Sequence, residues 1–98
     1  MRFLVRMTVR IPPGVDPTDL EQLKATEKAR ALELQRKGTW VHLWRVAGRY
    51  ENYSVFDVGS NDELHDVLSS LPLWPYMDVE VIPLATHPSA LDAQPSEG

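Results

Sequence analysis

The sequence has 98 residues, of which 43% are hydrophobic and 24% charged, and this composition is typical of one folded domain rather than a disordered chain. The net charge of −4 argues against nucleic-acid binding, and the lack of cysteine excludes disulfides, thiol catalysis and thiolate metal sites. We find neither a signal-peptide pattern nor an apolar run of the roughly 20 residues that cross a bilayer, so we expect a cytoplasmic protein without a membrane partner.

The first third of the chain predicts a strand followed by a helix. Residues 3–9 alternate between apolar and mostly polar side chains, which indicates a strand with one buried face. A helix should begin at Asp16 and Pro17, because aspartate caps helices and proline suits the first helical position. Gly38 should end it.

The middle of the chain predicts two strands joined by a tight turn. Residues 39–47 form the first, and simple alternation places Trp40, His42 and Trp44 on one face. Residues 50–58 form the second.

The last part predicts a short helix and a final strand. Residues 60–63 have the form of a capping box, an apolar stripe follows, and residues 76–82 form the strand. We expect a single domain over residues 1–86 and an extended arm over residues 87–98.

The resulting order, β-α-β-β-α-β, predicts the α+β ferredoxin-like fold, in which an antiparallel sheet carries two helices on one face. The other face would remain open and apolar, with some of the tryptophans on it. A thin domain with such a face should pair with another copy, so we expect a homo-oligomer.

Glu27 is the residue of most chemical interest, because it lies in the middle of the apolar stripe of the first helix. The stripe consists of Leu20, Leu23, Ala31 and Leu34. Burial would raise the pKa of a carboxyl there and suit it to act as a general base. From the pattern alone, a structural ion pair with Lys24 or Arg45, or a position at the open end of the stripe, is the commoner explanation.

Other polar residues give weaker signals. Arg45 could bind a carboxylate through two hydrogen bonds, although a solvated surface charge is equally consistent. Tyr76 could donate a hydrogen bond to an enolate, as could other tyrosines. No histidine pair has metal-ligand spacing, so we expect no metal, and Ser54 lacks the context of a nucleophile.

Several separate blocks of the sequence, in order, resemble the muconolactone delta-isomerase family. They are Leu23-Lys24-Ala25 with Glu27-Lys28, Gly38-Thr39-Trp40 with His42-Leu43-Trp44-Arg45, Asn52-Tyr53-Ser54-Val55-Phe56-Asp57-Val58, Leu64-His65, Leu71-Pro72, Pro75-Tyr76-Met77-Asp78 and His87-Pro88-Ser89. The resemblance spans about nine-tenths of the chain.

The resemblance implies a cofactor-free enzyme of the catechol branch of the β-ketoadipate pathway, which converts muconolactone to 3-oxoadipate enol-lactone. It also implies a subunit of the dimeric α/β-barrel type, with dimers assembled into a decamer and active sites between subunits.

Position and chemistry then suggest roles for individual residues. We expect Glu27 to move the proton and Lys24 and Tyr76 to stabilise an enolate. The expected substrate-binding residues are Arg45, His42, Trp40 and Ser54.

Three alternatives remain open on sequence alone. The first is 5-chloromuconolactone dehalogenase, which resembles the same family and would share much of the pocket. The second is a ferredoxin-like oligomer that binds a small effector without catalysis, and the third is a haem-binding or cofactor-free oxygenase of the related dimeric barrels.

Overall fold

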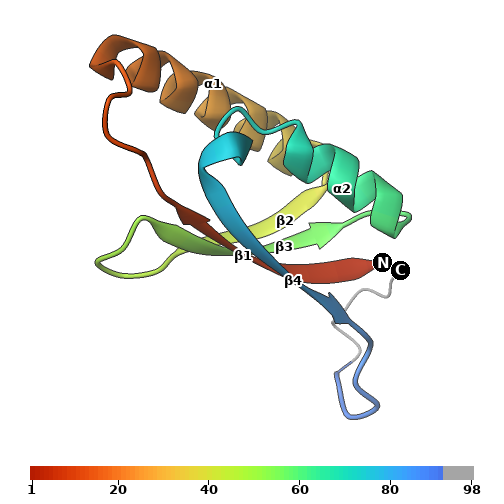
Figure 1. Ribbon diagram of the computed structural model, residues 1–98. Helices are drawn as coiled ribbons and strands as arrows, with labels where there is room; N and C mark the ends of the chain where they lie inside the picture. Colours follow the sequence, from red (N-terminus) through yellow and green to blue (C-terminus); the bar gives the residue numbers. More distant parts are fainter. Residues whose placement is uncertain (92–98) are drawn as a thin grey trace.

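The computed structural model describes residues 1–91 and shows two layers, a four-stranded sheet and two helices on one of its faces (Figure 1). The elements in chain order are β1 (Arg2–Val9), α1 (Pro17–Arg36), β2 (Trp40–Arg45), β3 (Glu51–Asp57), α2 (Asn61–Ser69), a short 3₁₀ helix η1 (Trp74–Tyr76) and β4 (Met77–Leu84). The strand order is β2-β3-β1-β4, and every neighbouring pair is antiparallel. The predicted α+β, ferredoxin-like fold is confirmed.

Helix α1 begins and ends where its sequence predicts. The Asp16 side chain accepts hydrogen bonds from the backbone N–H groups of Thr18 and Asp19 at 2.8 and 3.2 Å. These contacts satisfy donors that have no partner within the helix. After the last turn, Gly38 takes a φ of +80°, a conformation that glycine adopts without steric cost.

Helix α2 is held at its start by a reciprocal pair of side-chain contacts. Ser60 accepts from the N–H of Glu63 at 3.0 Å, and the Glu63 carboxylate accepts from the N–H of Gly59 at 2.9 Å. This arrangement closely follows the predicted capping box, with the return contact one residue further upstream.

The core lies between the helices and the sheet face that they cover. Its main members are Phe3, Val5 and Met7 of β1, Trp40, Phe56, and Ala31, Leu34, Leu64 and Leu68 of the helices. On α1, therefore, the C-terminal half of the predicted apolar stripe is buried. Leu20 and Leu23, in the first half, are only partly covered.

A bulge in β2 changes the faces that simple alternation predicts. Trp40 pairs with Phe56 and His42 pairs with Val55, so Val41 is an additional residue in this strand. Trp40 consequently faces the helices, whereas His42 and Trp44 lie on the open face. The expectation that all three share one face is wrong, because alternation assumes an uninterrupted pleat.

Some boundaries also differ from those predicted. Strands β2 and β3 are shorter than expected, because the turn between them takes up residues 46–50. Strand β4 continues to Leu84, which pairs with Arg2 of β1. Residues 87–91 carry no helix or strand, and the rest of the predicted arm, residues 92–98, lies outside the described residues.

The open sheet face carries large apolar side chains in contact with solvent. Trp44 is 55% exposed, and Tyr53, Ile82 and Leu84 are also exposed. Their pairing partners in the sheet place all four on the face opposite the helices. Within residues 1–91, no helix is long and apolar enough to cross a membrane.

Candidate active site

A cavity of about 450 Å³ lies between α1 and the adjoining part of the sheet. Its apolar walls come from Trp40, Leu43, Leu73 and Met77, among others. Its polar residues come from two directions: Lys24, Glu27, Lys28 and Gln35 from α1, and Arg45, Tyr50, Glu51 and Asn52 from the hairpin of β2 and β3. An apolar cavity with a few convergent polar groups is the usual form of a small-molecule site.

Glu27 lies in this cavity with one defined hydrogen bond. Its Oε1 accepts from the backbone N–H of Leu73 at 3.0 Å, and its side chain is partly buried. Burial raises the pKa of the Glu27 carboxyl, and the Leu73 hydrogen bond offsets part of that rise. Among the described residues Glu27 forms no ion pair, so the predicted pairing with Lys24 or Arg45 is absent there.

Cationic side chains line this cavity, although the chain as a whole is acidic. Lys24, Lys28 and Arg45 all contribute to its wall. The Tyr50 ring lies near two of them, with its centroid 5.6 Å from Lys24 Nζ and 5.4 Å from Arg45 Cζ. Such cation–π contacts hold flexible side chains in place. The cavity is therefore suited to an anionic ligand.

Asn52 is a polar group of the cavity to which we had assigned no role from the sequence. It pairs directly with Arg45 across the hairpin, so the two side chains share the face that points into the cavity. The Ser54 hydroxyl donates to Asn52 Oδ1 at 2.8 Å, which leaves the amide NH₂ of Asn52 available as a donor. The alternation along β3, which puts residues 52 and 54 on one face, is the signal that could have found this pair.

Ser54 itself has no contact with solvent and is not part of the cavity wall. The structure thus places it behind Asn52, where it orients that amide. Trp40 is a wall residue and is almost fully buried, and its indole Nε1 has no hydrogen-bond partner within the described residues.

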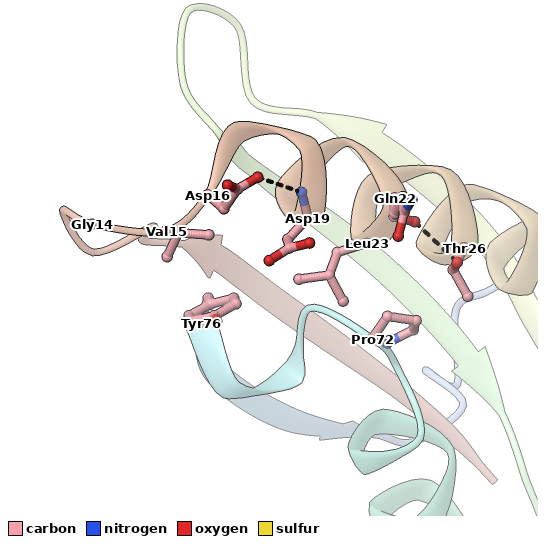
Figure 2. A pocket seen from close by; sticks show the side chains of 9 residues that line it. All are labelled: Gly14, Val15, Asp16, Asp19, Gln22, Leu23, Thr26, Pro72 and Tyr76. Carbon is pink, nitrogen blue, oxygen red and sulfur yellow. Dashed lines mark hydrogen bonds between the residues drawn. The ribbon is translucent and has the colours of Figure 1, made fainter.

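Tyr76 and His42, also expected at the site, lie elsewhere in this subunit. Tyr76 borders a separate, more open cavity of about 660 Å³ beside the start of α1, together with Asp16, Asp19 and Pro72 (Figure 2). His42 stacks on Trp44 on the open sheet face, with 4.9 Å between ring centroids. The bulge in β2 separates His42 from Trp40, and the regular alternation after it leaves His42 on the face opposite Arg45.

The first comparison with known proteins concerns sequence. A model of the muconolactone delta-isomerase family matches residues 1–90. The chain belongs to this family. A muconolactone delta-isomerase of Pseudomonas aeruginosa is 55% identical over 95% of this chain and 97% of its own length. One from Pseudomonas putida is 57% identical over 93% of this chain and 95% of its own length.

Structure agrees with sequence. A crystal structure of muconolactone isomerase superposes with a TM-score of 0.90, covers 96% of this chain and 98% of its own, and is 57% identical in sequence. The chain is therefore an enzyme of the muconolactone delta-isomerase family with that family's fold, as its sequence blocks indicated.

Proposed function

We propose that this chain converts muconolactone to 3-oxoadipate enol-lactone in the catechol branch of the β-ketoadipate pathway, and that the cavity between α1 and the β2–β3 hairpin is its active site. The observation that supports this most directly is Glu27, a partly buried carboxylate with a raised pKa inside a cavity rich in cations. The reaction moves one proton and one double bond within a carboxylate-bearing lactone. It needs a base, a donor to an oxyanion and an anchor for the carboxylate.

Glu27 is the base in this proposal. Its carboxylate takes the proton from the ring carbon that bears the acetate arm, and the electron pair spreads through the conjugated ring onto the carbonyl oxygen of the lactone. The Glu27 carboxyl then returns the proton at the other end of the conjugated system, so no external oxidant or reductant takes part. A positioned base of this kind contributes roughly 10²–10⁴-fold to the rate.

Lys24 and Asn52 are the proposed donors to the enolate oxygen. Both line the cavity, Lys24 on the same helix as Glu27 and Asn52 across from that helix on the sheet. Donors held in place before the reaction stabilise developing negative charge without reorganisation. In this subunit Tyr76 borders a different cavity, so we assign the enolate-stabilising role to Lys24 and Asn52 rather than to Tyr76.

Arg45 is the proposed anchor of the acetate carboxylate. Its guanidinium is oriented by the Tyr50 ring, and planar guanidinium groups bind carboxylates through two parallel hydrogen bonds. The apolar wall that includes Trp40 would hold the lactone ring beside Glu27.

We propose further that the protein acts in the cytoplasm and that several copies of the chain assemble there. The exposed apolar side chains of the open sheet face would be buried by a second copy, and the dimers would associate into a decamer. His42 lies on this face and would then be placed at an interface between copies, where it remains a candidate contact for substrate.

Proton NMR of the purified protein mixed with muconolactone tests the function. We expect the butenolide vinyl signals to disappear and enol-lactone signals to grow at a rate proportional to enzyme concentration. Unchanged signals at millimolar substrate would contradict the proposal. In that case, chloride release from 5-chloromuconolactone would favour the dehalogenase instead, since that enzyme would share much of the pocket.

A further inference from the structure

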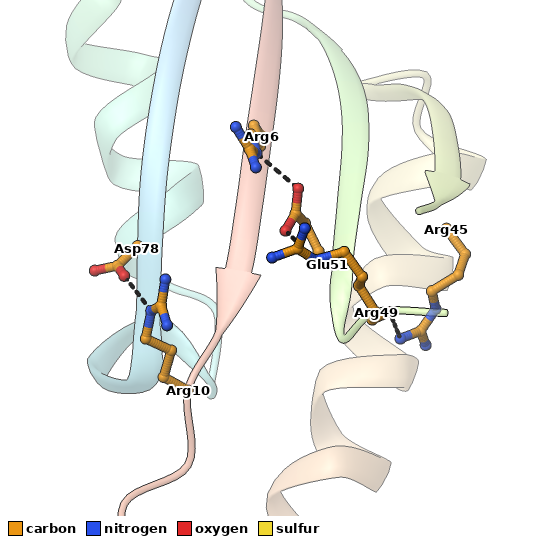
Figure 3. Close-up of polar contacts among 6 residues, drawn as sticks. All are labelled: Arg6, Arg10, Arg45, Arg49, Glu51 and Asp78. Atoms are coloured by element: carbon orange, nitrogen blue, oxygen red, sulfur yellow. Dashed lines mark hydrogen bonds and ion pairs between the residues drawn. The ribbon is translucent and has the colours of Figure 1, made fainter. Parts of the chain in front are cut away.

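Glu51, the first residue of β3, carries a buried carboxylate that has no part in the mechanism above. Its pairing with Thr8 places the side chain on the open face of the sheet, although the residue also borders the candidate active-site cavity. Its side chain is only 3% exposed, although the helices lie on the other side of the sheet. Two arginine side chains hold it: Arg6 Nε lies 2.7 Å from Oε2, and Arg49 Nε lies 3.5 Å from Oε1 (Figure 3).

This arrangement keeps Glu51 ionised. A carboxylate out of contact with water is costly unless charged partners offset that cost. Arg6 donates a hydrogen bond to Oε2, whereas Oε1 has no hydrogen-bond partner among the described residues and relies on the Arg49 guanidinium at 3.5 Å. The hydrogen bond from Arg6 lowers the pKa of Glu51 and outweighs the opposing effect of burial. Glu51 therefore presents a fixed negative charge to the Arg49 side chain at neutral pH.

Arg49 belongs to the turn that joins β2 to β3, next to the cavity residue Tyr50. The turn is closed by hydrogen bonds from Val46 N to the Glu51 carbonyl at 2.9 Å and from Arg49 N to the Val46 carbonyl at 3.1 Å. The carbonyl of Arg49 in turn accepts a hydrogen bond from Arg45 Nη1 at 3.3 Å. One residue thus links the carboxylate on the open face to the cation in the cavity.

We propose that Glu51 is a positioning residue for Arg45: by holding the Arg49 side chain, it fixes the turn whose carbonyl orients the Arg45 guanidinium toward a carboxylate-bearing substrate. The inference rests on the proposed function, in which Arg45 anchors the acetate arm. Glu51 does not touch the substrate in this scheme. It determines the fraction of time in which the Arg45 guanidinium is oriented to bind the substrate carboxylate.

A purely structural role for Glu51 makes a different prediction, and a second ion pair of the same sheet provides the comparison. Arg10 Nε lies 2.6 Å from Asp78 Oδ2, and both side chains are largely exposed (Figure 3). Neither residue lines the cavity around Glu27 or contacts the β2–β3 turn. Loss of this pair should leave substrate binding unchanged.

The test measures KM and kcat for muconolactone with Glu51→Gln, Arg49→Ala and the control Asp78→Asn. We expect Glu51→Gln and Arg49→Ala to raise KM about three- to tenfold with kcat within about twofold of wild type. The reason is that a poorly oriented Arg45 weakens binding of the ground state and of the transition state equally. Asp78→Asn should change neither constant. In an Arg45→Ala background, Glu51→Gln should have no further effect on KM, since Glu51 acts through Arg45.

Each outcome distinguishes the two claims. A wild-type chain that does not turn over muconolactone contradicts the proposed function. An active wild type whose KM is unchanged in Arg49→Ala, an exposed position that tolerates truncation, contradicts this inference alone, even if Glu51→Gln fails to fold. An equal rise in KM with and without Arg45 also overturns it.

Discussion

At the scale of single residues, the cavity combines a carboxylate that burial makes more basic with cations that attract an anionic lactone. Glu27 accepts one backbone hydrogen bond and forms no ion pair within residues 1–91, so burial is the main influence on its pKa. A carboxylate paired with Lys24 or Arg45 would be a weaker base, because a neighbouring cation favours the charged form.

The raised pKa of Glu27 predicts the pH dependence of the reaction. The base must be ionised, so kcat/KM should rise with pH through the Glu27 pKa and fall away below it, with a midpoint above the ordinary value of 4.5. Initial rates across the acid range, with circular dichroism at each pH to show that the chain stays folded, provide the measurement. A rate independent of pH down to about 4, near the reference pKa of a free glutamate, would contradict this role.

The sequence predicted some of these residues well and others poorly, for physical reasons. Glu27 was identifiable because a helix has a regular period and a charged residue interrupts its apolar stripe. Alternation along β3 could place Ser54 and Asn52 on the same face, but it does not give the hydrogen bond between their side chains. The role of Arg49 depends on a backbone carbonyl, which no side-chain pattern reports.

At the scale of elements, the bulge in β2 decides which side chains reach the cavity. The additional residue Val41 lets Trp40 pack in the core while Arg45 still points toward α1. His42 is turned to the other side of the sheet. Helix boundaries were predictable from local chemistry, since caps act within a few residues, whereas a bulge depends on the partner strand.

The N-terminal cap of α1 should contribute measurably to stability. Asp16→Ala removes the acceptor of two backbone N–H groups, and we expect the free energy of unfolding to fall by about 1 kcal/mol. Urea unfolding at one fixed protein concentration measures it, because association would otherwise shift the midpoint. Substitution of the exposed Glu21 by glutamine, on the same helix, is the control and should change stability by less than about 0.5 kcal/mol. Equal effects of the two substitutions would argue against the cap.

At the scale of the whole molecule, the thin two-layer subunit leaves one face of its sheet uncovered. The order of elements predicted this face from the sequence, because both helices of a β-α-β-β-α-β unit lie on the same side. Its composition was predicted less accurately, since the bulge moved Trp40 away from it and left Trp44 there.

Introduction of a charge on this face should prevent association. Trp44→Glu places a carboxylate within the proposed interface, and we expect a smaller assembly by size-exclusion chromatography with light scattering. Ala29→Glu, which adds the same charge at an exposed position of α1, should leave the assembly unchanged. If both variants keep the wild-type mass, the open face is not the contact between copies.

The most direct test of the central claim compares wild type with Glu27→Gln in the NMR assay with muconolactone in deuterated buffer. Glutamine can still accept the Leu73 N–H, and it removes the cost of a partly buried charge, so the variant should melt at the wild-type temperature or above. We expect its kcat to fall at least about 100-fold, the loss typical of a missing general base. A folded Glu27→Gln variant that turns over muconolactone within about threefold of wild type would contradict the assignment of Glu27 as the base.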